Sequence, residues 1–424
     1  MMRKNTIRDI EKRPLRVCIL SYRSNPHCGG QGVYVKNLSR ALKDIGCRVD
    51  VLSGPPDPDV DKDIGLTRLP GLDLYNSDNP FRIPGLSELK EPTNIVEALG
   101  VWTGGFPEPL TFGLRAYRHL KTRLHRYDIV HDNQSLSYPL LALSSRIPTI
   151  TTIHHPITID RKMEIRSRNW PWQKIKAYRW YSFINMQVRT ARRLPGAITV
   201  SECAKTDIVR EFKLSPDDLQ VVPNGIDTAR FYPIPAIERE KGHILVTTSA
   251  DVPLKGLRYL LLAVAKLVKK RDVKLTVVGK CSKKSVTGKL IRQLGIGPHV
   301  SFTGRITNGS FVKLYARASM AVVPSLYEGF GLPAGEAMAC GVPVISTTAG
   351  ALPEVVGDAG ILVPPGDADA LAEAIADLLD HPEKARRLGV AGMQRIHEKF
   401  TWRNAAQKTL DTYYRTIHDY RRLQ

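Results

Sequence analysis

Short runs rich in valine and isoleucine alternate with amphipathic segments along nearly the whole chain, and this alternation limits the fold more than any other feature. Such runs predict buried strands, whereas apolar residues that repeat at helical spacing predict helices between them. Alternating strands and helices are typical of parallel sheets with helices on both faces. The predicted strands cover residues 15–20, 49–52, 129–130, 149–152, 197–200, 219–222, 244–248, 274–278, 300–303, 320–323, 342–345 and 361–363.

A proline-rich and charged segment, residues 223–242, separates these strands into two groups. Such a composition is typical of a linker between domains, and a length of 424 residues suits two domains. We therefore expect an α/β protein in which two doubly wound parallel-sheet (Rossmann-like) domains, residues 1–222 and 243–400, face each other across a cleft. A C-terminal helix at residues 401–424 is expected to pack back on the first domain.

Several features exclude whole classes of protein. No run approaches the about 18 uninterrupted apolar residues that a membrane-spanning helix needs. The charged N-terminus is not followed by an apolar stretch, so we expect a cytoplasmic protein. The six cysteines show no metal-ligand or disulfide pattern. Residues 54–109 contain little periodicity, and a segment of that length predicts a functional surface excursion.

The chain carries 62 Lys and Arg against 41 Asp and Glu, a formal net charge of +21. An excess of this size predicts attraction to anions such as phosphates, nucleic acid or an anionic membrane. Much of it lies in residues 161–193, which hold ten basic residues, one glutamate and three of the five tryptophans. The residues expected to contact a membrane or an acceptor are Trp170, Trp172, Lys174, Lys176, Arg179 and Trp180.

From Trp172 this segment predicts a helix whose apolar residues include Ile175, Tyr178, Phe183 and Met186. Basic residues beside Trp and Tyr are typical of helices at a membrane interface, where the rings lie at headgroup level. Two other interpretations stay open: a helix packed on the core with a solvated basic face, and a nucleic-acid surface. The chain contains no recognisable nucleic-acid reading module, so we expect no nucleic-acid partner.

Three loops that follow predicted strands carry the candidate chemistry. The first, residues 28–33, contains Gly29 and Gly30 at the start of a predicted helix. Glycines there let backbone N–H groups approach a phosphate at the helix N-terminus. The loop lacks the G-x-G-x-x-G and Walker patterns, which disfavours a dinucleotide or P-loop site. A simple turn from strand to helix is the alternative.

The second loop, residues 251–256, places Lys255 before a predicted helix, where its charge could meet an anionic leaving group. A solvated lysine is the alternative. The third loop, residues 325–341, contains Glu328 and Glu336 on either side of a predicted helix start. Carboxylates so placed accept hydrogen bonds from sugar hydroxyls, and the intervening glycines expose N–H groups suited to phosphate. A glutamate that only caps its own helix is the alternative.

The third loop closely resembles the E-x7-E signature of glycosyltransferase family 4, whose members are retaining enzymes with the GT-B fold. The similarity around this signature covers residues 324–345. Further family motifs match at residues 29–30, 223–227 and 350–354. The resemblance spans nearly the whole chain and implies transfer of a hexose from a nucleoside-diphosphate sugar.

The resemblance also implies roles for individual residues. Glu336 would bind the nucleotide ribose, and Lys255 would neutralise the leaving phosphates. Gly30 would approach the phosphates from the other domain. Glu328 would hold the donor sugar and diphosphate with the help of the backbone that follows it. That backbone segment is Gly329, Phe330 and Gly331.

A histidine after a predicted first-domain strand would lie against the sugar, and we assign this role to His154 rather than to the histidine after it. The expected catalytic residues are therefore His154, Lys255 and Glu328. The chain departs from the family at one point, because no arginine occurs a few residues before Lys255. Arg305 and Lys280 are the candidates for the missing charge.

The expected reaction proceeds with retention, and the leaving phosphate itself takes the acceptor's proton because no carboxylate nucleophile is evident. We expect no cofactor beyond the nucleotide sugar and no metal: Asp57 and Asp59 have the D-x-D spacing but lie in a proline-rich turn. The expected acceptor is a lipid or lipid-linked glycan at the membrane surface, and a soluble acceptor is the alternative. From other classes, a nucleic-acid-binding protein and a catalytically inactive GT-B binding protein remain alternatives.

Overall fold

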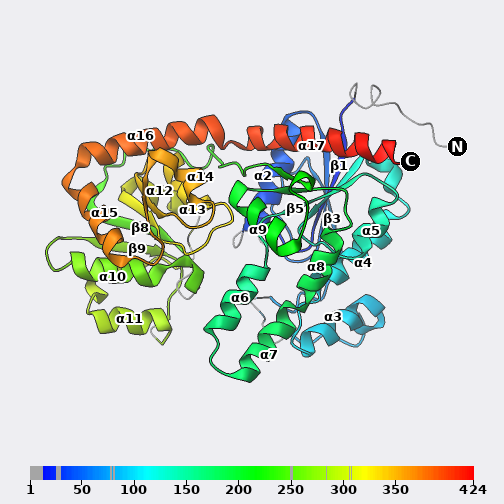
Figure 1. Cartoon of the computed structure of the whole chain (residues 1–424), viewed down its shortest axis with the longest axis horizontal. Helices are drawn as coiled ribbons and strands as arrows, with labels where there is room; N and C mark the ends of the chain where they lie inside the picture. The colour runs from blue at the N-terminus through cyan, green and yellow to red at the C-terminus, as the bar shows by residue number, and fades with distance from the viewer. Residues whose placement is uncertain are drawn as a thin grey trace. The chain divides into compact units, whose positions relative to one another are not determined.

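The computed structural model describes residues 13–24, 30–76, 79, 82–248, 252–282, 284–304, 306 and 308–424 (Figure 1). The chain divides into two compact units. Unit 1 comprises Met1–Val200, Ala204–Pro223 and Trp402–Gln424, and unit 2 comprises Ser201–Cys203 and Asn224–Thr401. Each unit contains one sheet whose paired strands are parallel, and helices connect the strands. The predicted α/β class with two doubly wound sheets is confirmed.

The sheet of unit 1 has the strand order β3-β2-β1-β4-β5-β6-β7. Its strands are β1 (Arg16–Ser21), β2 (Arg48–Ser53), β3 (Gly65–Arg68), β4 (Ile129–Asn133), β5 (Thr149–Ile153), β6 (Ala197–Thr199) and β7 (Leu219–Val221). The α-helices in this part of the chain are α2 (Gly30–Asp44), α3 (Pro92–Trp102), α4 (Glu108–Leu120), α5 (Pro139–Ser144), α6 (Thr158–Ser167), α7 (Pro171–Trp180), α8 (Ile184–Ala191), α9 (Glu202–Phe212) and the C-terminal α17 (Trp402–Arg422).

The alternating side chains of β1 show why helices cover both faces of this sheet. Val17 and Ile19 belong to a buried cluster that includes residues of α2 and α17. Cys18 and Leu20 belong to a second buried cluster with residues of α4 and α5. A strand buried on both faces is apolar throughout, which is why this run was recognisable in the sequence. The C-terminal helix α17 packs against α2.

The sheet of unit 2 has the order β10-β9-β8-β11-β12-β13. Its strands are β8 (Glu240–Thr247), β9 (Lys274–Val278), β10 (Val300–Phe302), β11 (Ala318–Val323), β12 (Val344–Thr347) and β13 (Ile361–Val363). Its α-helices are α10 (Leu257–Leu267), α11 (Val286–Leu294), α12 (Asn308–Arg317), α13 (Leu332–Ala339), α14 (Leu352–Val356), α15 (Ala368–Asp380) and α16 (Pro382–Lys399). Because β8 and β11 are neighbours, the loops that follow them leave the same edge of the sheet side by side.

Two local predictions differ from the structure. Residues 54–109 are more regular than expected, since they contain β3 and α3. The strand was missed because it is a four-residue edge strand without a fully buried side chain, so it has no apolar run. The tryptophan-rich segment is not one helix from Trp172: a 3-10 turn at Tyr181–Phe183 separates α7 from α8.

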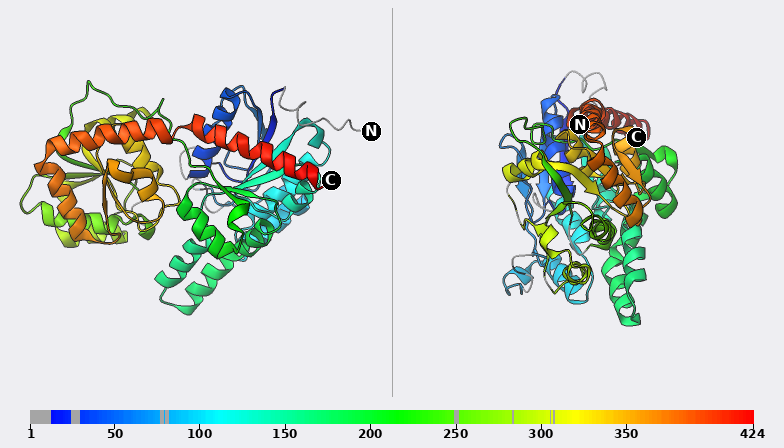
Figure 2. Two further views of the ribbon diagram at one scale, coloured as in Figure 1. Left: turned by 45° about the horizontal axis from the view of Figure 1, so that its top comes forward. Right: turned by 90° about the vertical axis from the view of Figure 1, so that its left-hand side faces the viewer.

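Helices α6 and α7 pack against each other and project from unit 1 as a helical hairpin (Figure 2). Only Ala177 is buried in α7, whereas five residues of α8 are buried. The alternative of a helix packed on the core therefore fits α8 and does not fit α7. Among the helices that the structure describes, none combines the length with the apolar composition that a membrane span requires.

Candidate functional site

An ion pair joins two neighbouring loops of unit 2. Lys255 lies in a 3-10 turn at Pro253–Lys255 after β8, and Glu328 lies in the loop after β11. The Lys255 Nζ atom is 2.7 Å from Glu328 Oε1, and Ser325 Oγ donates a hydrogen bond of 2.9 Å to the same oxygen. The Glu328 side chain is 11% exposed and that of Lys255 is 34% exposed. The pair is therefore partly shielded from water, yet the ammonium keeps an open side.

Two glycines allow the loops around this pair to touch. Gly256 has a φ of +66°, and a Cβ atom there would lie 1.8 Å from the carbonyl oxygen of Pro324. Gly350 has a φ of +58°, and a Cβ atom there would lie 2.2 Å from the carbonyl oxygen of Glu328. The same Glu328 oxygen accepts a hydrogen bond of 2.9 Å from the N–H of Ala351. Only glycine suits both positions, so three loops hold the Glu328 backbone in place.

Glu336 lies on α13, the helix that begins at Leu332 just after the loop of Glu328. It is the fifth residue of the helix and thus lies at the end of its first turn. Burial raises its pKa to about 8, and nearby Asp227 adds to this, while Arg230 and a hydrogen bond from Tyr315 act in the opposite direction. At neutral pH this carboxyl group is therefore mostly protonated.

The backbone between the two glutamates leads into the N-terminus of α13. The carbonyl oxygen of Gly329 accepts a hydrogen bond of 2.8 Å from Ser201 Oγ. The Phe330 ring is 5% exposed and packs against Phe400, with 5.8 Å between ring centroids. The Phe330 ring is therefore closed to a ligand. Gly331 precedes the helix with a φ of +102°.

Two residues were predicted as substitutes for the missing arginine. Arg305 lies outside the described residues. Lys280 follows β9, on the same edge of the sheet as Lys255, and its side chain is exposed. Whether either contributes charge stays a prediction.

In unit 1, α2 begins at Gly30, and Gly29 lies outside the described residues. A Cβ atom at Gly30 would meet no described atom within 4 Å. A helix of 15 residues presents unpaired N–H groups and a positive potential at this end.

His154 follows β5 in unit 1, and its neighbours come from the end of β4, the residue after it and α2. The His154 Nε2 atom lies 2.7 Å from Asn133 Oδ1, and its backbone N–H donates to Gln134 Oε1 at 2.8 Å. The ring meets the Tyr34 ring edge to face, with 4.7 Å between centroids. Burial lowers the pKa of His154 to about 3, helped by the nearby His155 and His131.

The histidine at 154 is therefore a neutral group, whereas His155 Nε2 lies 2.8 Å from the carboxylate of Asp160. Asn133 and Gln134 were missed by the sequence analysis. One signal could have found them: both lie at the end of a strand that neighbours β5, and the ends of parallel strands meet at one edge of a sheet.

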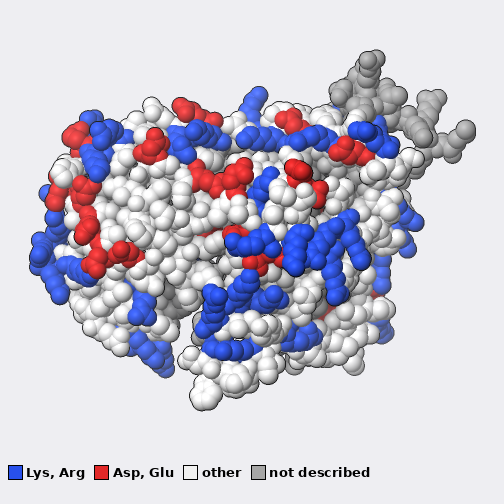
Figure 3. Space-filling model, viewed as in Figure 1, with Lys and Arg blue, Asp and Glu red and all other residues white. Residues whose placement is uncertain are grey.

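The tryptophan-rich part of unit 1 presents an apolar surface with basic residues beside it. Trp170 is 63% exposed, Trp172 is 54% exposed, and Ile175 and Tyr178 on the same helix are also open to solvent. Lys176 Nζ lies 4.8 Å from the centre of the Trp172 ring. In the view of Figure 3, Lys and Arg side chains gather over the region where Figure 1 labels α6 and α8.

Trp180 and Arg179, at the end of the same helix, have contacts with other parts of unit 1. Trp180 is partly covered, with its ring 5.0 Å from Tyr75 and 5.3 Å from Phe106 between centroids. Arg179 donates hydrogen bonds to Thr103 and Ser182. Lys174 is exposed. The α7 face, defined here as Trp170, Trp172, Lys174, Ile175, Lys176 and Tyr178, is thus a surface and not a part of the core.

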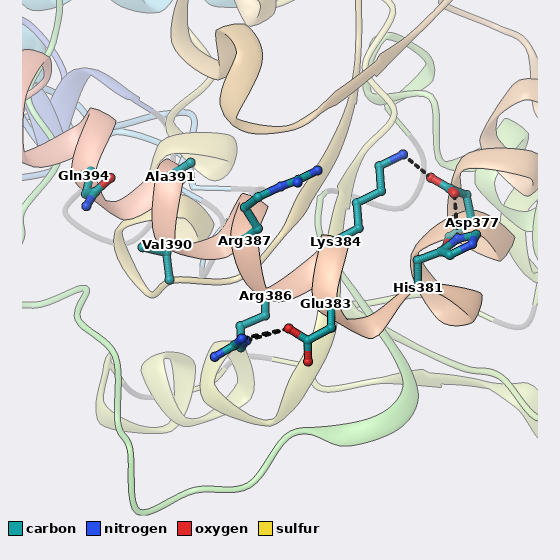
Figure 4. A pocket seen from close by; sticks show the side chains of 9 residues that line it. All are labelled: Asp377, His381, Glu383, Lys384, Arg386, Arg387, Val390, Ala391 and Gln394. Carbon is teal, nitrogen blue, oxygen red and sulfur yellow. Dashed lines mark hydrogen bonds and ion pairs between the residues drawn. The ribbon is translucent and has the colours of Figure 1, made fainter.

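A surface groove lies elsewhere in unit 2. It has a volume of about 860 Å³ and runs along the end of α15 and the first half of α16 (Figure 4). Two ion pairs lie along it: Lys384 lies 2.6 Å from Asp377, and Arg386 lies 2.7 Å from Glu383. None of the predicted site residues lines this groove.

Asp57 and Asp59, which have the D-x-D spacing, are engaged in ion pairs. Asp57 lies 2.6 Å from Arg68, and Asp59 pairs with Lys36. In the part of the chain that the structure describes, no group of three or more His, Cys, Asp or Glu residues is arranged to hold a metal ion.

Two protein-family patterns match the chain. Residues 28–230 match Glycosyltransferase Family 4, and residues 233–395 match Glycosyl transferases group 1. The MMP alpha-(1->4)-mannosyltransferase of Mycolicibacterium hassiacum is 47% identical over 408 residues, which cover 95% of this chain and 98% of that protein. The D-inositol 3-phosphate glycosyltransferase of Streptomyces bingchenggensis is 27% identical over 453 residues, which cover 99% of this chain and 93% of that protein.

Solved structures of similar fold include sucrose-phosphate synthase from Thermosynechococcus elongatus, with a TM-score of 0.73 and 24% identity. The match covers 96% of this chain and 100% of that one. Anabaena HepE, solved in complex with UDP and glucose, has a TM-score of 0.68 and 18% identity, and the match covers 94% of this chain and 99% of that one.

Proposed function

Because the chain belongs to glycosyltransferase family 4 and has the GT-B fold, we propose that it transfers a hexose from a nucleoside-diphosphate sugar with retention at the anomeric carbon. The hexose is proposed to be mannose and the new bond an α-(1→4) linkage. This proposal is supported by the relative that is 47% identical, which is named for that transfer. The bound UDP and glucose of HepE support a nucleotide-sugar donor.

The arrangement around Glu328 carries the proposal. Lys255 already contacts this carboxylate and has further N–H donors for a second anion, such as the leaving phosphate. The backbone from Gly329 to Gly331 leads to the N-terminus of α13, which attracts phosphate. Glu336 is proposed to accept the ribose hydroxyls. Unit 2 is thus assigned the nucleotide and diphosphate, and Gly30 and His154 of unit 1 the phosphates and sugar.

The proposed step breaks the bond between the anomeric carbon and the phosphate oxygen. The acceptor oxygen bonds to the same carbon on the same face, and its proton passes to the departing phosphate. With retention, an α-linked donor gives an α-linked product, which is the linkage named for the relative. Lys255 and the α13 N-terminus stabilise the negative charge that grows on the diphosphate, which is the main contribution of the protein to such a transition state. No cofactor or metal is part of the proposal.

For the acceptor, we propose a lipid-linked glycan at an anionic membrane. A glycan is supported by the mannosyltransferase relative, and the membrane is supported by the α7 face, where exposed aromatic rings lie beside lysines. A soluble glycan is the second candidate. Transfer of the hexose to a soluble glycan would follow the same reaction, but the α7 face would then have no role in membrane binding.

A thermal-shift screen against UDP-, GDP- and ADP-sugars tests the donor. A ligand at about 100 times its Kd adds about 2.7 kcal/mol to the free energy of unfolding, so a matching donor gives a clear shift. We expect Glu336→Ala and Lys255→Ala proteins to remain folded and to lose this shift. Unchanged donor affinity in both variants would remove the assignment. Retention of nucleic acid without any response to nucleotide sugars would favour a nucleic-acid-binding protein instead.

A further inference from the structure

The loop after β4 has an unusual backbone for a loop without glycine. Gln134 has a φ of +56° and Leu136 a φ of +46°, both in the left-handed region that non-glycine residues rarely adopt. Such a conformation persists only where the surroundings hold it, and it is found most often at functional sites. The hydrogen bonds that stabilise this loop therefore indicate its function.

Asp132, at the end of β4, fixes the loop from inside. Its carboxylate accepts hydrogen bonds from the Leu136 N–H at 3.0 Å, from Thr151 Oγ1 at 2.9 Å and from Ser135 Oγ. From the other side, Gln187 Nε2 of α8 donates to the carbonyl oxygen of Gln134 at 3.0 Å. Asp132 and Gln187 are fully buried, so the strained loop has no water to compete for these bonds.

The side chain of Gln134 clamps the segment after β5. Its Oε1 accepts the His154 backbone N–H at 2.8 Å, and its Nε2 donates to the carbonyl oxygen of His155 at 3.0 Å. One side-chain amide thus forms hydrogen bonds with the backbone of two consecutive residues, His154 and His155. The left-handed backbone of Gln134 is what presents the side chain to that loop.

The neighbouring Asn133 fixes the ring of His154. Asn133 Nδ2 donates to Ser21 Oγ at 3.3 Å, so its Oδ1 is the atom that faces His154 Nε2 at 2.7 Å. An amide oxygen only accepts, so Nε2 must carry the hydrogen and donate it. In a neutral ring, Nδ1 then has the lone pair. Among the described residues, no hydrogen bond to Nδ1 occurs, and the Tyr34 ring restricts rotation.

We propose that Asn133 and Gln134 are positioning residues that hold His154 as the Nε2–H tautomer, with Nδ1 free to accept a hydrogen bond from a sugar hydroxyl. His154 then acts on a hydroxyl group and not as a cation on the diphosphate, which leaves charge neutralisation to Lys255. The tautomer is inferred only from hydrogen bonds within unit 1 and does not depend on the proposed function. Only the sugar contact rests on the proposed function.

The tautomer can be measured directly without substrate. In protein labelled with ¹⁵N at histidine, the two ring nitrogens have different chemical shifts when one carries hydrogen, and His154→Gln assigns the signals. We expect Nε2 of His154 to be protonated and Nδ1 unprotonated near neutral pH. Protonation at Nδ1, or at both nitrogens, would overturn the proposal. In Asn133→Leu we expect the preference to be lost, whereas in Asn133→Asp, which keeps an acceptor oxygen facing Nε2, we expect it to be retained.

Kinetics test the positioning role. We expect Gln134→Glu, which puts an acceptor against the His155 carbonyl, to lower kcat by about tenfold or more with little change in the KM for the donor. Ser137→Ala is the matched control, since Ser137 is buried in the same loop but has no hydrogen bond to His154 or His155. A folded Gln134→Glu protein with the kcat of the control would overturn the role. A failure of the proposed function would look different, with no nucleotide-sugar binding and the His154 tautomer unchanged.

Discussion

Glu328 Oε1 lies 2.7 Å from Lys255 Nζ, so the acid proposed to hold the donor sugar also holds the lysine proposed to meet its diphosphate. The two residues are 73 positions apart in the sequence and are brought together by the neighbouring strands β8 and β11. The carboxylate keeps the flexible lysine side chain near the start of α13. The ion pair is therefore expected to prepare the site for an anion before the donor arrives.

Removing the lysine should destabilise the protein moderately. In Lys255→Ala the Glu328 carboxylate, which is 11% exposed, loses its cation. We expect the free energy of unfolding to fall by between about 1 kcal/mol, as for exposed pairs, and about 3 kcal/mol, as for buried ones. Urea unfolding measures this loss. A double variant that also carries Glu328→Ala is the control, and we expect it to recover part of the stability.

Stability should depend on pH through Glu336. Its pKa is raised to about 8 from the ordinary 4.5, mainly by burial, so the folded protein binds the proton more tightly than the unfolded chain. This contribution is fully present below about pH 4.5 and is lost as the pH rises through about 8, at up to about 1.4 kcal/mol per pH unit. Comparing urea unfolding of wild type and Glu336→Gln at acidic, neutral and basic pH tests this. Parallel pH profiles for the two proteins would contradict the prediction.

Donor binding should release protons near neutral pH. Ribose hydroxyls donate to a carboxylate, and hydrogen bonds to the charged form lower the pKa of an acid. We therefore expect part of a proton to leave Glu336 on binding of a nucleoside diphosphate. Titration calorimetry in two buffers with different ionisation enthalpies measures it. Phosphate groups of the nucleotide also titrate in this range. Glu336→Gln is therefore the necessary control, since it should remove only the protons that Glu336 releases.

The sequence predicts the sheets well because strands buried on both faces, such as β1, are continuous apolar runs. It also offers Glu328, Glu336 and Lys255 as candidates, through their glycine-rich surroundings and the family resemblance, and their roles stay predictions. It cannot predict the contact between Lys255 and Glu328, which depends on strand order. Nor does it predict the clamp on His154, since the left-handed backbone of Gln134 is stabilised by residues distant in sequence.

Metal removal should have no effect on activity. The proposal assigns the charge of the leaving diphosphate to Lys255 and to the backbone at the start of α13, and both remain when divalent ions are chelated. We expect the transfer rate in excess EDTA to equal the rate in magnesium. A loss of activity in EDTA that added magnesium restores would show that an ion takes part.

The α7 face should bind anionic membranes. Trp170 and Trp172 are 63% and 54% exposed, and lysines flank the rings, so both apolar burial and attraction to lipid phosphates favour binding. In vesicle sedimentation we expect binding when an anionic lipid is present, weaker binding to neutral vesicles, and a further decrease at high salt because salt screens the charges. Replacing Trp170 and Trp172 by Ala should weaken binding by about tenfold or more, equivalent to about 1.4 kcal/mol.

The matched control for this experiment is Trp102→Ala, since Trp102 is 58% exposed but lies on α3. If loss of any exposed tryptophan weakened binding equally, the effect would not belong to the α7 face. Equal binding to neutral and anionic vesicles, or none to either, would remove the membrane from the proposal. The acceptor would then be a soluble glycan, and donor binding by unit 2 and the His154 tautomer in unit 1 would be unaffected, because neither involves α7.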